Sequence, residues 1–500
     1  NKTLRDIDKI KYLQGTSDNS IKVLWTDSIM FQRLQRYIHN DISLQTYYEE
    51  LNEYQLKFSN NLPIYSNDAE VFNFRPGRFS QEATIEHDEW AKIKELFILL
   101  SEKGLDFQLP GEITNSGDYE DGEQKIVTSC SYPAIVKKQP KYNLSRWALT
   151  GRDDIWINTM CFRILKYIQN QNDEDVLIEG ERLLCELWSS DLRTHITDKR
   201  WIAAKDKIFL FCKDADIDTS MSLKNSIEDE ASKDAENLFS GTIENDDESR
   251  MLILKTDNLE LTLNPFKGLS IQSLKFHSLN SQKVIGSIPA YYFDNIELGA
   301  DFFSGGLLAD MPEDRKRLTD YCFVDPNIKF YKEFIEISAE ICIGDFVLRK
   351  SYLVNDSEES IVMQYRFLNW STTNMVARVG NFIFLEEGFQ DNMYYKTTSG
   401  GVNSEVFPIN KTFDQSKPIS SLVSSTTCIP SSTGEIIMGS GDDALSFKWD
   451  MAQVAALPML VNKISHNARF TRLIFSLSEI DDTSKNQAHL PDFEIKISSV

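Results

Sequence analysis

Two carboxylic acids, Asp68 and Glu70, directly follow the strand-like run 61–66 (NLPIYS). In α/β folds the catalytic groups gather where parallel strands end, so these acids are the first candidates for general acid and base work. A turn is the simpler alternative, because Asn67 and Asp68 form a common turn pair. Arg75 follows a few residues later, where it could hold a carboxylate ionised, clamp a polar ligand or form a structural ion pair.

A second group of side chains suits the recognition of a sugar. Trp147, Arg152 and Asp153 lie close together in the sequence and combine a stacking ring with planar hydrogen-bonding groups. A sugar offers apolar C–H faces to aromatic rings and vicinal hydroxyls to polar groups, so both kinds of contact are satisfied. The alternative is structural, with a tryptophan in the core and a helix capped by Asp153 or Asp154.

Two further segments carry polar side chains of the same kind. Asp191 and His195 stand together at the end of a predicted helix, although a lone histidine is more often structural. The run 291–306 (YYFDNIELGADFFSGG) is an aromatic and acidic loop that contains Glu297 and Asp301. Such a loop suits the wall of a ligand site and equally suits a surface that packs against a neighbouring domain.

Hydrophobic periodicity indicates the elements that must position these side chains. Residues 1–125 alternate strand-like runs with helices, which is typical of an α/β unit with parallel strands. Apolar residues recur at helical spacing within 126–213, which predicts a small helical domain. Residues 214–249 are acidic and poor in large apolar side chains, so they predict a linker. The period is two over 250–500, which predicts one large antiparallel β-sandwich.

The composition argues against several classes of function. The 500 residues carry a formal net charge of −23, which disfavours nucleic acid and anionic membranes as partners. No apolar run is long enough to cross a bilayer. The histidines and cysteines show no metal-binding or redox spacing, and nucleotide-binding motifs are absent, so we predict no cofactor and no catalytic metal. The scattered cysteines and polar first residues favour the cytoplasm.

Several segments resemble the glycoside hydrolase family 57 group, especially members encoded with bacterial surface-polysaccharide genes. The similar segments are 22–38 (KVLWTDSIMFQRLQRYI), 62–79 (LPIYSNDAEVFNFRPGRF), 137–154 (KKQPKYNLSRWALTGRDD), 186–195 (ELWSSDLRTH) and 292–306 (YFDNIELGADFFSGG). The last of them resembles a loop in the C-terminal sandwich of such proteins, which is akin to galactose-mutarotase-like domains. The resemblance therefore touches all three predicted regions.

The resemblance implies a seven-stranded (β/α) barrel, a helical domain and a mutarotase-like β-sandwich. It also implies retaining cleavage of α-glycosidic bonds in an oligo- or polysaccharide. The glutamate nucleophile and first barrel strands of the family map onto no residue of this chain, whose first residue is Asn1. We therefore expect either an additional N-terminal segment or partner chain that completes the barrel, or a non-catalytic glycan-binding or assembly protein. A third alternative is epimerisation in the sandwich by Glu297 and Asp301.

The implied mechanism is double displacement at an anomeric carbon. Asp68 would protonate the leaving oxygen while another carboxylate attacks, and would then deprotonate water. This role needs a raised pKa, which a nearby carboxylate such as Glu70 or Asp191 would supply. The expected substrate-binding residues are Glu70, Arg75, Trp147, Arg152, Asp153, Asp191, His195, Glu297 and Asp301.

Overall fold

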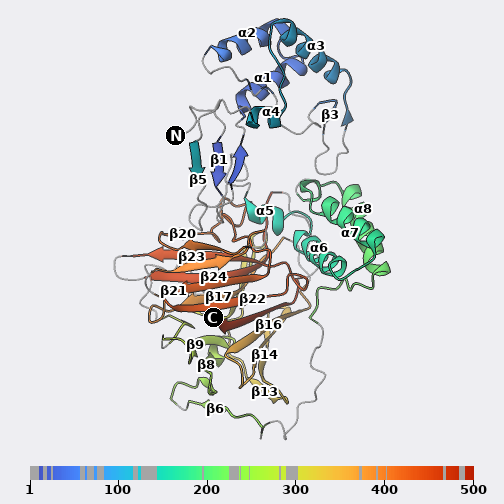
Figure 1. Cartoon of the computed structure of the whole chain (residues 1–500). Coiled ribbons are helices and arrows are strands. Elements are labelled where there is room, and N and C mark those ends of the chain that lie inside the picture. The colour runs from blue at the N-terminus through green and yellow to red at the C-terminus, as the bar shows by residue number, and fades with distance from the viewer. Residues whose placement is uncertain are drawn as a thin grey trace. The chain divides into compact units, whose positions relative to one another are not determined.

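The computed structural model divides the chain into two compact units, Asn1–Val127 and Thr128–Val500 (Figure 1). The residues that the structure describes are 11–14, 20–23, 26–56, 62, 64, 72–75, 84–115, 122–125, 143–193, 196–223, 236, 238–246, 248–280, 283–288, 302–370, 374–389, 392–400, 403–465, 469–482 and 490–500. Within these ranges, no helix combines the length and apolar character that a bilayer crossing requires.

The first unit is built around amphipathic helices. Its described helices are α1 (Ser28–Ile38), α2 (Leu44–Gln55), α3 (Glu89–Glu102) and α4 (Pro110–Asn115), and its described strands are β1 (Lys11–Gln14), β2 (Ser20–Val23), β3 (Phe74–Arg75), β4 (Thr84–Ile85) and β5 (Gly122–Lys125). The apolar faces of α1, α2 and α3 meet in one core, where Leu34, Tyr47 and Leu96 are fully buried. Burial of these faces stabilises helices that are marginal in isolation.

Capping side chains fix where α1 and α2 begin. Asp27 accepts a hydrogen bond from the backbone N–H of Ile29 at 2.7 Å. Ser43 accepts one from the N–H of Thr46 at 3.1 Å. Each bond satisfies a donor that the first turn of a helix leaves without an intrahelical partner.

The small sheet of the first unit is mixed. β1 pairs in parallel with β5 and antiparallel with β2. The expected parallel arrangement is therefore wrong for β2. The reason is the connection, because only five residues separate β1 from β2 and a parallel crossover needs about a dozen or more. The seven-stranded barrel stays a prediction.

The second unit begins with helices, as the helical spacing predicts. They are α5 (Leu144–Ala148), α6 (Asp154–Ile168), α7 (Glu174–Leu187), the short 3₁₀ helix η3 (Ser190–Leu192) and α8 (Asp198–Asp214). α6, α7 and α8 share an apolar core that includes Ile164, Leu184 and Ile208. Thr197 caps α8 by accepting a hydrogen bond from the N–H of Arg200 at 3.4 Å.

The rest of the second unit consists of two large antiparallel sheets, which confirms the predicted sandwich-like region. The described strands of one sheet are β6 (Thr242–Asn245), β7 (Leu252–Lys255), β8 (Leu259–Asn264), β9 (Ser270–Phe276), β10 (Ile285–Gly286), β11 (Gly306–Met311), β12 (Lys316–Thr319), β17 (Val376–Phe384), β20 (Phe413–Asp414), β23 (Leu457–Ile464) and β24 (Arg469–Ser478). Those of the other are β13 (Asn327–Phe330), β14 (Ile335–Ile343), β15 (Phe346–Val354), β16 (Ser360–Leu368), β18 (Tyr394–Thr397), β19 (Glu405–Pro408), β21 (Glu435–Ser440), β22 (Asp443–Lys448) and β25 (Phe493–Ser499).

Alternate residues of the facing strands fill the space between the sheets. Phe475 on β24 packs against Phe493 on β25, with ring centroids 5.5 Å apart. Phe382 on β17 and Phe447 on β22 approach to 5.3 Å. All four rings are fully buried, so the period of two reflects one face that packs inward and one that points away from the core.

The sheet begins inside the segment 214–249 that was expected to be a linker. β6 pairs antiparallel with β7 over Thr242–Asn245. Ile243 on β6 and the preceding Phe239 are partly buried against the sandwich core. Two apolar side chains at a sheet edge are enough to extend the sheet into a mainly acidic stretch.

Candidate functional site

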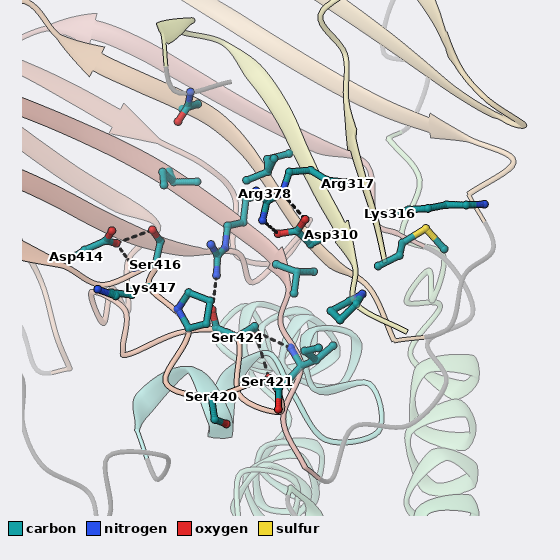
Figure 2. Close-up of a pocket in the computed structure, with 18 of the residues that line it drawn as sticks. Asp310, Lys316, Arg317, Arg378, Asp414, Ser416, Lys417, Ser420, Ser421 and Ser424 are labelled. Atoms are coloured by element: carbon teal, nitrogen blue, oxygen red, sulfur yellow. Dashed lines mark hydrogen bonds and ion pairs between the residues drawn. The ribbon is translucent and has the colours of Figure 1, made fainter. Parts of the chain in front are cut away.

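A pocket of about 550 Å³ opens on the first sheet of the second unit, and Figure 2 shows it in close-up. Its lining residues come from β11, β12, β17, β20, β23 and β24, from the turn between β11 and β12, from the loop 415–424 that follows β20, and from the residues after β24. Its volume lies within the range of about 300–1,000 Å³ that is usual for small-molecule sites. Because it lies on the sheet face opposite the sandwich core, we call it the outer-face pocket.

The alternation of β11 and β17 places charged side chains in the pocket. These strands pair antiparallel with Leu308 opposite Arg378 and Asp310 opposite Val376, and all four residues line the pocket. The intervening Ala377 is fully buried in the sandwich core. Since neighbouring residues of a strand point to opposite faces, the buried residues fix the direction of the charged ones.

A β-bulge turns one more polar side chain into the pocket. Between Val379 and Phe382, β17 carries one residue more than the facing stretch of β24. Gly380 and Asn381 occupy the extra length with positive φ angles of 89° and 44°, a conformation open to glycine and tolerated by asparagine. Asn381 lines the pocket and donates a hydrogen bond from Nδ2 to the carbonyl of Phe303 at 2.8 Å.

The lining of the outer-face pocket is strongly cationic. Seven cationic side chains face two carboxylates, in a chain whose formal net charge is −23. The cations are Arg315, Lys316, Arg317, Arg378, Lys417, Lys463 and Arg472, and the carboxylates are Asp310 and Asp414. A cleft lined by one sign of charge focuses its field and raises the local concentration of counter-ions.

Arg378 forms the buried floor of the pocket together with Glu479. Its Nε and Nη2 donate to the two carboxylate oxygens of Glu479 at 2.7 and 2.9 Å, and Nη2 also donates to the carbonyl of Ser424 at 2.9 Å. Burial acts to lower the pKa of Arg378, but the charge of Glu479 raises it and the net shift is upward. The hydroxyls of Ser424 and Ser476 also donate to Glu479, so the guanidinium is held in one orientation.

Both carboxylates of the lining are already engaged by protein groups (Figure 2). Asp310 accepts two hydrogen bonds from Arg317, from Nε at 2.6 Å and from Nη2 at 2.8 Å. Oδ1 of Asp414 accepts from the N–H of Ser416 at 2.9 Å and from its hydroxyl at 2.7 Å. The pocket therefore offers mainly hydrogen-bond donors to a ligand.

Three cations at the rim have no such partner. The side chains of Arg315, Lys316 and Lys417 are exposed and form no ion pair or hydrogen bond with residues of the described ranges. In Figure 2, Lys417 and Lys316 lie on either side of Arg378. Repulsion among like charges disfavours such a cluster, so an anionic ligand would relieve an electrostatic cost.

Five residues expected at the site lie outside the residues that the structure describes. They are Asp68, Glu70, His195, Glu297 and Asp301. Their roles in acid and base work or in binding stay predictions. Among the described residues, no group of three or more histidine, cysteine, aspartate and glutamate side chains is arranged to hold a metal ion.

Arg75 of the first unit forms an ion pair, which was one of the three alternatives expected for it. Its Nη2 and Nη1 donate to the carboxylate of Glu89 at 2.6 and 3.1 Å. The backbone N–H of Asn73 also donates to Glu89 at 2.8 Å. Burial acts to raise the pKa of Glu89, but the bonds from Arg75 and Asn73 lower it, and the net shift is downward. A role of Arg75 in binding sugar stays a prediction.

Trp147, Arg152 and Asp153 lie at the start of the helical region. Trp147 is half-buried in α5. Arg152 forms an ion pair with Asp198 and donates from Nη2 to the carbonyl of Ile196 at 3.1 Å. These contacts join the start of α6 to the start of α8. None of the three residues lines the outer-face pocket.

Asp153 occupies the N-cap position of α6. Desolvation raises its pKa to about 6, although the N–H of Trp156 and the charge of Lys205 act in the opposite direction. The neighbouring Asp154 is fully buried, and burial raises its pKa well above the usual range. Two adjacent carboxyls at one helix start therefore hold their protons more tightly than carboxyls in water.

Asp191, the last of the described candidates, is exposed within η3. Its Oδ2 lies 3.5 Å from Nη2 of Arg200, and both side chains are about half exposed. Exposed pairs of this kind contribute little to stability. A contact with sugar stays a prediction for Asp191, which does not line the outer-face pocket.

A buried ion network between α5 and the end of β24 was not expected from the sequence. Nε of Arg146 lies 3.1 Å from Asp481, and its Nη2 lies 2.7 Å from Asp482. Asp481 also accepts a hydrogen bond from Thr150 at 3.0 Å. Arg146 is 1% exposed, so loss of either partner of this network would leave a buried charge uncompensated.

The outer-face pocket was also not expected from the sequence. One local signal was present, because Arg315, Lys316 and Arg317 are consecutive cations in an acidic chain. The serine-rich run 416–427 was a second signal, since hydroxyls and turns often bind ligands. Arg378 and Arg472 gave no local signal in the sequence, because only strand pairing brings them to one face of the sheet.

No protein-family model and no curated protein matches the chain. Similar solved structures include a galactose mutarotase-like protein from Clostridium acetobutylicum, with 8% identity, a TM-score of 0.35, and coverage of 52% of this chain and 97% of that one. Alpha-N-acetylgalactosaminidase NagBb from Bifidobacterium bifidum has 8% identity and a TM-score of 0.34, over 50% of this chain and 36% of that one. A 4-alpha-glucanotransferase from Thermococcus litoralis has 10% identity and a TM-score of 0.30, over 99% and 76%.

The similar structures thus include two carbohydrate-active enzymes and a mutarotase-like protein. The chain spans about a third of the length of NagBb. Identities and TM-scores this low define neither a family nor an activity for the chain.

Proposed function

We propose that the chain is a carbohydrate-active protein that binds an oligo- or polysaccharide in the outer-face pocket. The observation that carries the proposal is the pocket itself, which has the volume of a small-molecule site and a lining of polar side chains on a rigid sheet. Aliphatic contacts from Met311, Pro312 and Ile474 complete the lining. The resemblance of five sequence segments to glycoside hydrolase family 57 supplies the class of ligand.

In its finer form the proposal assigns retaining cleavage of an α-glycosidic bond to Asp68 as acid and base. The sandwich would be of the galactose-mutarotase type, and a further N-terminal segment or a partner chain would complete the barrel. These parts are supported by the sequence resemblance. A non-catalytic glycan-binding or assembly protein is the second candidate, because no residue of the chain matches the nucleophile of the family.

Binding is tested first, with the full chain on an array of neutral and acidic oligosaccharides. We expect specific retention of at least one class of glycan. A surface that retains none of them would contradict the proposed function.

Turnover is then tested with Asp68→Asn on the retained α-linked oligosaccharide. If Asp68 is the acid and base, the variant loses nearly all release of new reducing ends while it still binds glycan, because the amide cannot donate the proton. Asp106→Asn, an exposed acid of the same unit, serves as the matched control and should retain turnover. Binding without turnover in the unsubstituted chain would favour the non-catalytic protein.

A further inference from the structure

The hydrogen-bonding character of the outer-face pocket is one-sided. A neutral sugar hydroxyl both donates and accepts, so sites for neutral sugars need carboxylate or amide acceptors. Asp310 and Asp414 are the carboxylates of this lining. Both oxygens of Asp310 and Oδ1 of Asp414 already accept from protein donors, and seven cations surround the two groups. The lysine and arginine side chains around them only donate. The lining is thus complementary to a group that only accepts, and phosphate, sulfate and carboxylate are such groups.

The floor and the rim of the pocket offer two different kinds of donor. Arg378 and Arg472 are each 7% exposed and lie on the neighbouring strands β17 and β24. Glu479 and the Ser424 carbonyl engage Nε and Nη2 of Arg378, while its Nη1 has no protein partner within the described contacts. A buried and fixed guanidinium of this kind is suited to orient an oxyanion.

Two exposed lysines add positive charge at the rim, on opposite sides of Arg378. Lys316 projects from β12, and Lys417 belongs to the loop after β20. Neither is paired with a described residue, so both are available to a ligand. Their ammonium groups would attract an anion, and the buried arginines would set its position.

No aromatic ring is among the described residues that line the pocket. A neutral sugar would therefore find no stacking surface here, and affinity must come from charge and hydrogen bonds. Single-stranded nucleic acid also relies on aromatic stacking and on a long basic groove. The lining favours a small ligand with a localised negative charge.

We infer that the outer-face pocket takes the oxyanion of an acidic saccharide, a sugar that carries a phosphate, sulfate or carboxylate group. The inference deepens the proposed function and rests on it, because the sugar is supplied by that proposal and the anion by the lining. The rim lysines attract the anion, and the arginines of the floor orient it.

The test uses matched pairs of neutral and acidic oligosaccharides, with phosphorylated, sulfated and uronic-acid members, bound to the full chain. Inorganic phosphate is the competitor. The variant is Lys316→Gln with Lys417→Gln, which removes two exposed charges and leaves Arg378 paired with Glu479. Lys255→Gln, an exposed lysine on β7 of the same sheet, is the matched control.

We expect each acidic glycan that binds to be retained more strongly than its neutral counterpart and to be displaced by phosphate. The double variant should bind it at least about tenfold more weakly, since two charge-assisted hydrogen bonds are lost. Lys255→Gln should match the unsubstituted chain within about twofold, as expected for a remote exposed charge. Added salt should weaken binding more in the unsubstituted chain than in the double variant. The acidic member that binds best identifies the oxyanion.

Four outcomes would overturn the inference in different ways. Equal retention of neutral and acidic glycans would contradict the inference, and so would unchanged binding by the double variant. Neither result would contradict the proposed function. Retention of no glycan at all would remove the proposed function and the inference with it. A single-stranded oligonucleotide that displaces the acidic glycan as well as a free acidic sugar does would assign the cations to a phosphate polymer instead.

Discussion

Asp153 is a carboxyl group that burial keeps protonated to an unusually high pH. Its pKa is raised to about 6, mainly by desolvation, whereas an unfolded aspartate has a pKa of about 3.9. A group that binds its proton more tightly in the folded state favours folding when protonated and opposes it when charged. The loss of folding stability caused by ionisation of Asp153 is therefore absent at about pH 4. It grows as the pH rises towards about 6 and is largest above pH 6.

We predict that Asp153→Asn stabilises the second unit at neutral and higher pH. Asparagine caps a helix as well as aspartate does, so the substitution removes the charge and keeps the N-cap residue type. The increase in the free energy of unfolding should rise from near zero at about pH 4 to at most about 3 kcal/mol at about pH 8. Urea unfolding across this range measures it.

The matched control for Asp153 is Asp206→Asn, an exposed carboxylate on α8. It should change stability by less than about 0.5 kcal/mol at every pH. A gain for Asp153→Asn that does not vary with pH would show that desolvation of this carboxylate is not the cause.

Single residues also show the limit of sequence reasoning about the site. The capping bond from the N–H of Ile29 to Asp27 spans two residues, so a cap of this kind can be recognised from the sequence alone. The role of Arg378 was not recognisable, because it depends on Glu479, which directly follows β24 and is far away in the sequence. The charge of a residue is visible in a sequence, but its non-local partner is not.

At the scale of elements, one carboxylate joins the β3–β4 hairpin to α3. Glu89 is the first residue of α3 and 7% exposed, and it accepts bonds from Arg75 and from the N–H of Asn73. Its pKa is lowered on balance, so this contribution to stability is present above the unfolded pKa of about 4.3. It is lost as the pH falls through the folded value.

We predict that Glu89→Gln lowers the free energy of local opening at this junction by about 1–3 kcal/mol at neutral pH. The reason is that Arg75 then bonds a neutral amide in place of a carboxylate. Hydrogen exchange of the peptides that contain β3 and the start of α3 measures the loss. The difference from the unsubstituted chain should shrink as the pH falls through the lowered folded pKa of Glu89, because Glu89 is then protonated in both states. Glu102→Gln, at the exposed end of α3, should leave exchange unchanged, and equal loosening by both variants would contradict the role of the pair.

Elements that depend on local periodicity were predictable, and those that depend on pairing were not. The period of two revealed the sandwich, and the helical spacing revealed α6 to α8. The direction of β2 and the bulge of β17 are set by the strands beside them, so no local pattern specified either. The outer-face pocket belongs to the second class, because six strands and a loop must assemble before it exists.

At the scale of the second unit, the helices are not a separate domain in energetic terms. Leu149, just after α5, and Ile155 on α6 belong to the same buried core as the sandwich sheets. Nε of Arg163 on α6 donates to the carbonyl of Ala452 at 2.6 Å. The Asn143 side chain donates to the carbonyl of Ser425 at 3.0 Å, next to the loop that lines the outer-face pocket. A shared core makes cooperative unfolding the expected behaviour.

Arg146 provides the test of this cooperativity, because its partners Asp481 and Asp482 follow β24. Arg146→Met leaves Asp481, whose side chain is fully buried, without its cation, and should cost about 3–5 kcal/mol. Arg182→Met, an exposed arginine on α7, should change stability by less than about 0.5 kcal/mol. Denaturation followed by far-ultraviolet circular dichroism and by tryptophan fluorescence, with Trp156 in α6 and Trp449 after β22, measures both quantities. If helices and sheets form one cooperative unit, the circular dichroism signal and the tryptophan fluorescence shift together in Arg146→Met. Two separate transitions would show that the shared core does not couple helices and sheets.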